Sequence, residues 1–331
     1  MNKTCTIDEL AVIWKRVLKQ ASIKPDDNFF ELGGNRELTI ELVHQLTKLC
    51  DRELSPIMIF QAPTIRDMAS LLEQSERPVP CPPLFLLKRG AGSPPIFLAH
   101  GMGGDATQLF DIAEHLGVNN SVYATQVPGI DGISEPLDSV ERMATFFLDA
   151  IRKVQPQGPY LLIGYSFGGL VMLEIARRLL AQNETVGFLA MLDTYPHRAQ
   201  LSWKQKLPLL TRLAVRRLAV HARDLRNRMS QQPLKSTLQL FRERVHSAES
   251  TAWTGYRPEF YPGSLYFLRA QVSSYYPRNA RAVWGSLVGE LEVHTVPGDH
   301  AALVATQCQA VAKLLTEQLQ WQCGQNVSRA V

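Results

Sequence analysis

One serine of this chain stands in a setting typical of a catalytic nucleophile. The segment LLIGYSFGGL contains a Gly-x-Ser-x-Gly motif with Ser166 at its centre. The residues before it read as a buried strand and those after it as an amphipathic helix, and this strand–turn–helix context is what the motif needs to expose its hydroxyl. The helix directs its positive end towards negative charge that develops at the serine. These features predict covalent catalysis by Ser166, in preference to a serine that only occupies a glycine-rich turn.

A serine nucleophile needs a base, and the base needs a group that orients it. Among the eight histidines, His300 follows a strand and precedes the last helix, which is the chain order expected of the base. His294 lies inside that strand and reads as a structural residue. No Asp or Glu occurs in residues 270–289, where many hydrolases place the acid, and Asp299 is too close in sequence to reach behind the His300 ring. We therefore assign Asp193, at the end of the strand after the nucleophile's strand, as the orienting carboxylate rather than as a simple turn cap.

Acyl transfer also needs donors that stabilise the oxyanion of the tetrahedral intermediate. The N–H group of Phe167, directly after the nucleophile, is expected to be one donor. We assign the Met102 N–H as the second donor, because the glycines of the loop LAHGMGGDA have no side chains that would cover its backbone amides. His100 is expected to shape this turn. No metal-ligand cluster and no phosphate-cradling loop competes in the sequence, so these residues predict acyl transfer through a covalent acyl-Ser166.

The elements that must position these residues begin near Leu84. Short apolar runs alternate with helical stretches, as in PPIFLAH, SVYATQV, PYLLIGY, VGFLAML and SLYFLRA. Such runs are typical of buried strands, so we expect a mostly parallel α/β sheet with helices on both faces over residues 84–322. Between Leu201 and Arg257 the alternation stops, and this segment holds twelve Lys and Arg against three Asp and Glu. It is predicted to form a helical lid, over about residues 198–257.

The first part of the chain has a different periodicity. Apolar residues at helical spacing predict helices over residues 7–21, about 38–49 and 63–74, so residues 5–76 read as a small all-α bundle. The proline-rich segment SERPVPCPP then predicts a semi-extended linker over residues 77–83.

Length and composition agree with two globular domains. The chain has 331 residues and a net charge of +4, which by itself does not suggest a nucleic-acid or membrane binder. Its five cysteines lack the close spacing of a metal or redox motif. We see no leader peptide and no apolar run near the roughly 20 residues of a membrane helix, so we expect a cytoplasmic protein with reduced thiols.

Between the first two helices, the segment NFFELGGNRELTI reads as a loop that presents a side chain. Phe29 and Phe30 are its apolar anchors, the two glycines allow a sharp turn, and Asn35 is a good helix N-cap. The residue in the presented position is Arg36.

Residues 5–76 resemble a carrier-protein domain of nonribosomal peptide and polyketide synthetases, and residues 83–321 resemble the thioesterase that ends such assembly lines. The motifs are DNFFELGGN in the first part, and HGMGG, GYSFGG, LDTYP, YRPEFYPGSLYFLRA and VPGDH in the second. The resemblance implies an α/β hydrolase fold with a lid, behind a carrier-type bundle. It implies a serine thioesterase of natural-product biosynthesis, in which the acid follows the strand after the nucleophile, as Asp193 does.

The chain departs from the carrier family at one position. The family presents a serine to which a phosphopantetheine arm is attached, whereas Arg36 has no hydroxyl. Asn35 and Glu37 cannot replace that serine, and Thr39 lies a turn further into the helix. We therefore expect no cofactor on this chain, and an acyl or peptidyl substrate that arrives in trans on the pantetheine arm of a partner carrier. Arg36 itself is interpreted as a drifted, solvent-exposed residue, in preference to a contact with an acidic partner.

Several alternatives stay open at this point. The same chemistry fits an editing, type II-like thioesterase that clears misprimed carriers, and a non-catalytic scaffold or docking protein is a third class. A generic esterase would not need a carrier bundle. The basic lid either receives a pantetheine phosphate or acidic carrier, or is the solvated face of lid helices. The substrate chain, and hydrolysis against cyclisation, are not specified by the residues.

Overall fold

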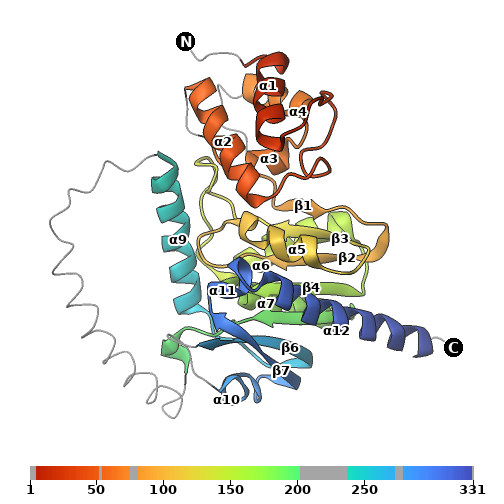
Figure 1. Cartoon of the computed structure of the whole chain (residues 1–331). Helices are drawn as coiled ribbons and strands as arrows, with labels where there is room; N and C mark the ends of the chain where they lie inside the picture. The colour runs from red at the N-terminus through yellow and green to blue at the C-terminus, as the bar shows by residue number, and fades with distance from the viewer. Residues whose placement is uncertain (1–4, 52–53, 75–80, 202–236, 273–278, 330–331) are drawn as a thin grey trace.

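A small helical bundle lies at one end of a larger α/β sheet domain in the computed structural model of the chain (Figure 1). The structure describes residues 5–51, 54–74, 81–201, 237–272 and 279–329. Most of the expected lid, residues 198–257, and most of the expected linker, residues 77–83, therefore lie outside the described residues. The described part of this expected lid consists of residues 198–201 and helix α9 (Thr237–Gly255) with the two residues after it.

The bundle is built from helices α1 (Ile7–Leu18), α2 (Arg36–Cys50), α3 (Met58–Gln61) and α4 (Ile65–Gln74). A capping box of Thr6 and Glu9 starts α1, and the left-handed backbone of Lys19 ends it before the expected residue 21. The short helix α3 was not predicted, because four residues are too few to show helical periodicity. The side chains that fill the bundle core are fully buried, among them Leu10, Trp14, Leu42, Leu46 and Ile59.

The sheet has seven strands in the order β1-β3-β2-β4-β5-β6-β7. All neighbouring strands are parallel except β1, which pairs with β3 in the antiparallel sense and was not predicted. The strands are β1 (Leu84–Lys88), β2 (Gly92–Ala99), β3 (Asn120–Thr125), β4 (Tyr160–Tyr165), β5 (Val186–Leu192), β6 (Tyr261–Val272) and β7 (Val288–Asp299). Because β4 and β5 lie in the middle, the loops at their carboxyl ends meet at the centre of one sheet edge.

Helices cover both faces of the sheet, as expected. One face packs against α6 (Val140–Val154), α7 (Phe167–Ala181) and α10 (Ala280–Trp284), and the other against α5 (Phe110–His115), α11 (Ala302–Ala305) and α12 (Cys308–Arg329). Within β2, Phe97 and Ala99 enter the first core, and Ile96 and Leu98 enter the second. Burial on both faces explains why the strands read as unbroken apolar runs. Short 3₁₀ helices η1 (Ala106–Leu109) and η2 (Arg198–Gln200) complete the fold. Across the described residues, we find no helix whose length and apolar character suffice to cross a bilayer.

An aromatic cluster joins the bundle to the sheet domain. Phe30 stacks on Phe60 with ring centroids 4.6 Å apart, and it also packs against Phe110 of α5 at 5.2 Å. Phe60 in turn meets the edge of Phe85 in β1, at 6.5 Å. Ile57, at the start of α3, is buried in the same core as α5 and α12. The bundle is therefore docked on the sheet domain through apolar contacts, above β1 and α5 in Figure 1.

Arg36 lies at this junction, and the expectation that it is solvent-exposed is wrong. The residue is half-buried, and among the described residues its Nε atom has no hydrogen-bond acceptor. Partial burial and the Glu37 carboxylate raise the pKa of Asp111 in α5, and the Arg36 guanidinium opposes this shift. The start of α2 therefore faces α5, because the aromatic cluster docks the bundle in this orientation.

We predict that Phe60→Ala weakens the docked arrangement. Its ring is half-buried between the two parts, so the free energy of unfolding should fall by about 1–2 kcal/mol, less than for a fully buried phenylalanine. The linker between the parts should also be cleaved faster by a protease. Urea unfolding followed by circular dichroism, together with limited proteolysis, measures both effects.

The matched control is Phe260→Ala, since this ring is 56% exposed and should cost less than about 0.5 kcal/mol. Equal losses of stability in the two variants, with equal proteolysis, would show that the aromatic cluster does not hold the bundle.

Candidate active site

Ser166 sits on a sharp turn between β4 and α7. Its backbone is in an unusual region, with φ 54° and ψ −122°, and non-glycine residues keep such angles only where the surroundings enforce them. A Cβ atom on Gly164 would lie 2.4 Å from Gly169 Cα, and one on Gly168 would lie 2.3 Å from the His100 carbonyl oxygen. The glycines of the motif are therefore required by close backbone approach, and the turn projects the serine from the carboxyl edge of the sheet.

The structure brings the three residues predicted for catalysis into one hydrogen-bonded chain. Ser166 Oγ lies 2.8 Å from His300 Nε2, and His300 Nδ1 lies 2.8 Å from Asp193 Oδ2. Because a carboxylate only accepts hydrogen bonds, Nδ1 carries the proton and Nε2 is left to accept from the serine hydroxyl. Asp193 is 2% exposed, and its other oxygen accepts the Ala270 N–H at 3.1 Å. The catalytic roles of these residues stay a prediction, but the geometry is what general-base activation of a serine requires.

The two rejected candidates near His300 are placed elsewhere. Asp299 accepts a hydrogen bond from the Ala302 N–H at 3.0 Å, at the start of α11. The His294 ring pairs with Glu292 at 2.6 Å, within β7. Neither contacts the serine in these bonds, which agrees with the choice made from the sequence.

The loop of residues 100–104 carries Met102, one of the two expected oxyanion donors. His100 Nδ1 is 2.7 Å from the Gly101 carbonyl oxygen, which fits the expected role of His100 in shaping the turn. Met102 and Phe167 both line a pocket of about 270 Å³ that also contains Ser166 and His300. Phe167 is the first residue of α7, where backbone N–H groups lack partners within the helix. Their use as oxyanion donors stays a prediction.

Several residues of this site were not identified from the sequence. The Tyr165 ring stacks on His300 with centroids 5.0 Å apart, and its hydroxyl donates to the His300 carbonyl oxygen at 3.0 Å. Trp253 of α9 lines the pocket, and its Nε1 donates to the Tyr195 carbonyl oxygen at 3.1 Å. Glu249, also on α9, accepts the Gly103 N–H. The position of Tyr165 next to the nucleophile was a usable signal, whereas contacts of α9 depend on a long connection that no local pattern reveals.

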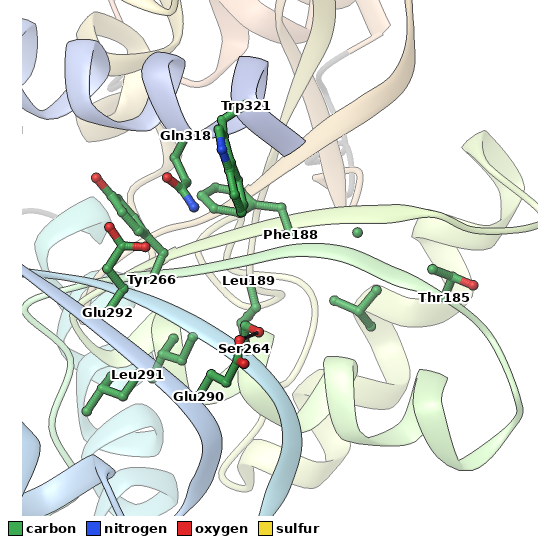
Figure 2. Close-up of a pocket in the computed structure, with 13 residues that line it drawn as sticks. Thr185, Phe188, Leu189, Ser264, Tyr266, Glu290, Leu291, Glu292, Gln318 and Trp321 are labelled. Atoms are coloured by element: carbon green, nitrogen blue, oxygen red, sulfur yellow. Dashed lines mark hydrogen bonds between the residues drawn. The ribbon is translucent and has the colours of Figure 1, made fainter. Parts of the chain in front are cut away.

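A larger pocket, of about 560 Å³, lies at the opposite edge of the sheet. Figure 2 shows it between the amino-terminal ends of β5, β6 and β7 and the helix α12, which contributes Trp321. Its carboxylates are already engaged, since Ser264 donates to Glu290 at 2.7 Å and His294 pairs with Glu292. This pocket holds none of the residues predicted for catalysis, so we place the functional site at the smaller one.

The chain matches two protein families and is similar to nonribosomal peptide synthetases. The family described as "Thioesterase domain" matches residues 94–319, and the one described as "Phosphopantetheine attachment site" matches residues 8–72. The dimodular nonribosomal peptide synthase of Bacillus subtilis (strain 168) is 34% identical over 188 residues, which cover 57% of this chain and 8% of the synthase. This chain therefore spans less than a tenth of that relative's length.

Two solved structures share its fold. A holo four-domain nonribosomal peptide synthetase bound to AMP and glycine matches with a TM-score of 0.60 and 26% identity, over 94% of this chain and 26% of its own. The NocB thioesterase domain, in covalent complex with a fluorophosphonate nocardicin G analogue, matches with a TM-score of 0.54 over 69% of this chain and 96% of its own. At 23% identity the second likeness shows the fold alone. The chain thus belongs to the thioesterase domain family, with an α/β hydrolase fold preceded by a carrier-type domain of the phosphopantetheine-attachment family.

Proposed function

We propose that this protein is a serine thioesterase that takes an acyl or peptidyl chain from a carrier-bound pantetheine thioester onto Ser166. It then releases that chain by hydrolysis or cyclisation in the biosynthesis of a natural product. The observation that carries the proposal is the continuous hydrogen-bonded chain from Ser166 through His300 to Asp193, at the wall of a pocket. The synthase relatives support the same context.

The geometry supports a two-step acyl transfer. His300 Nε2 takes the hydroxyl proton as Ser166 Oγ bonds to the thioester carbonyl carbon, and the N–H groups of Met102 and Phe167 donate to the oxyanion. The carbon–sulfur bond then breaks, and His300 returns the proton to the departing thiol. In the second step His300 deprotonates water or a nucleophile of the acyl chain, which attacks the carbonyl carbon of the acyl-Ser166 ester. The bond from that carbon to Ser166 Oγ then breaks, and His300 returns the proton to Oγ. Asp193 holds the ring and stabilises its cationic form throughout.

We propose that the substrate arrives on another protein's arm. Arg36 occupies the attachment position and has no hydroxyl to form a phosphate ester, so the residues here do not fit the arm. Thr39, the nearest hydroxyl in that helix, is 2% exposed and donates to the Asn35 carbonyl oxygen at 2.8 Å. The bundle is also docked with this end of α2 against α5, which suits a fixed spacer better than a shuttling carrier.

The alternatives differ in what they require. An editing thioesterase would use the same residues on misprimed carriers. A non-catalytic scaffold would not need the hydrogen-bonded set of Ser166, His300 and Asp193, and that set therefore favours an enzyme.

We predict that Ser166→Ala and His300→Ala each reduce kcat for a small acyl thioester by about 10⁴-fold or more, because the nucleophile and its base act as a unit. Asp193→Asn should lower it by a comparable factor, since the amide favours the wrong tautomer. Steady-state hydrolysis measures the effect, and His294→Ala, placed in β7 away from the serine, is the matched control. Activity of Ser166→Ala above a hundredth of the wild-type value would contradict the assignment.

We predict that the chain gains no pantetheine arm when it is incubated with coenzyme A and a promiscuous phosphopantetheinyl transferase. Intact-protein mass spectrometry checks this, and Arg36→Ser, which restores a hydroxyl at the start of α2, should gain one arm. A mass gain of one arm on the wild-type chain would refute the trans arrangement and would leave the assignment of Ser166 untouched.

A further inference from the structure

Glu249 is a buried carboxyl group that the proposed reaction does not use. It lies on the lid helix α9 and is 1% exposed. Its Oε2 accepts a hydrogen bond from the Gly103 N–H at 2.5 Å, across 146 residues of sequence. Gly103 belongs to the loop that holds Met102, the expected oxyanion donor, so this bond connects the lid helix to the site of charge development.

The helix also packs directly on the backbone of this loop. Val245 lies one helical turn before Glu249, so both side chains are on the same face of α9. A Cβ atom on Gly104 would lie 3.0 Å from Val245 Cγ1, and Val245 is 1% exposed. Gly103 and Gly104 both have positive φ, at 101° and 71°. Side chains of α9 therefore pack directly on the backbone of Gly103 and Gly104, and the position of this loop depends on the position of α9.

The described hydrogen bonds fix both peptide planes beside Met102. The Gly101 carbonyl oxygen accepts a hydrogen bond from His100 Nδ1, which holds the plane of the Gly101–Met102 peptide. Because the Met102 N–H is trans to that carbonyl, it points away from His100. Glu249 holds the second plane through the Gly103 N–H. Gln126, at the end of β3, donates to the Gly104 carbonyl oxygen. Of these three contacts, the one from Glu249 is made by the lid helix.

We propose that Glu249 is a positioning residue. It anchors the Met102–Gly103 peptide, so that the backbone of Met102 is held from both sides and the neighbouring Gly101–Met102 peptide, held by His100, keeps its N–H aimed at the oxyanion. This geometry then depends on the place of α9. The inference rests on the proposed function, because the oxyanion is part of that reaction. The donor is then in place when α9 lies on the loop, and it loses one of its supports when α9 moves away.

The protonation state of Glu249 supplies a readout of this role. Burial raises the pKa of Glu249 to about 8, and the Gly103 N–H opposes the shift. A second titratable group faces it, since His100 Nδ1 lies 3.9 Å from Glu249 Oε1. Burial lowers the pKa of His100, against smaller opposing effects of its hydrogen bond to the Gly101 carbonyl and of Asp105, and this direction favours the neutral ring. Both shifts favour the uncharged form of each group near neutral pH.

Ionisation of Glu249 is expected to act against the oxyanion. The pKa of the folded state lies above that of an exposed glutamic acid, so the stabilisation that this group contributes is complete below the pKa of the unfolded chain and is lost as pH rises through about 8. Above that pH a buried carboxylate stands near the developing negative charge, and the repulsion between the two charges lowers the rate.

The test uses the rate at which a fluorophosphonate probe labels Ser166 in the full chain, because phosphonylation also builds negative charge at the oxyanion donors. Glu249→Gln keeps an acceptor oxygen and should label within about threefold of wild type at pH 7. Glu249→Ala should label about 10–100-fold more slowly, with reversible probe binding changed less than about threefold. The wild-type rate should fall as pH rises through about 8, and the Glu249→Gln rate should not.

The matched control is Glu243→Ala, an exposed glutamate on the same helix, which should label like wild type. Equal rates for Glu249→Ala and Glu243→Ala, or an alkaline fall that persists unchanged in Glu249→Gln, would overturn the inference and leave the proposed function standing. If Glu249→Ala does not fold by circular dichroism, the pH comparison of Glu249→Gln decides alone. A wild-type chain that is never labelled would overturn the proposed function, and this inference with it.

Discussion

The site depends on backbone contacts around the turn at Ser166 that leave no room for a Cβ atom. A Cβ on Gly169 would lie 2.0 Å from Thr194 Oγ1, and one on Gly168 would meet the His100 carbonyl oxygen. These contacts press the ends of β5 and β2 against the start of α7, so the serine, the acid-bearing loop and the oxyanion loop form one packed edge. The strand β6 provides no acid of its own, and its backbone instead holds Asp193, whose N–H donates to the Leu268 carbonyl oxygen at 2.7 Å. Asp193 can thus reach His300 from β5.

The docked bundle gives the chain an organisation that its family membership alone does not imply. A carrier that delivers a tethered substrate must expose the attachment position, whereas the start of α2 here faces α5, beside a cluster of four phenylalanine rings. Arg36, at the position where the carrier family has its attachment serine, has no hydroxyl and is a partly buried cation. The proposed absence of an arm and the docked position of the bundle are consistent with each other, since a bundle without an arm would not need to move between sites.

Local patterns in the sequence were sufficient for the elements whose burial is uniform. The strands with apolar residues on both faces, the turn at Ser166 and the loop that carries His300 were all predicted, because each has a signal within about ten residues. Asp193 followed from the order of strands along the chain. The edge strand β1 and the four-residue helix α3 were missed because they are short. Tyr165 against His300, Glu249 against Gly103 and the orientation of Arg36 arise from tertiary packing between distant segments, and no spacing rule encodes them.

The central claim is that the acyl chain passes through a covalent ester on Ser166. A rapid-quench experiment tests this claim directly. The protein is mixed with a carrier-bound acyl thioester, the reaction is stopped with acid within the first turnover, and the peptides are mapped by mass spectrometry. The account predicts that the acyl mass appears on the peptide that contains Ser166 and decays at the rate at which product is released. Steady turnover with no acyl mass on that peptide, or with the mass on another residue, would contradict it.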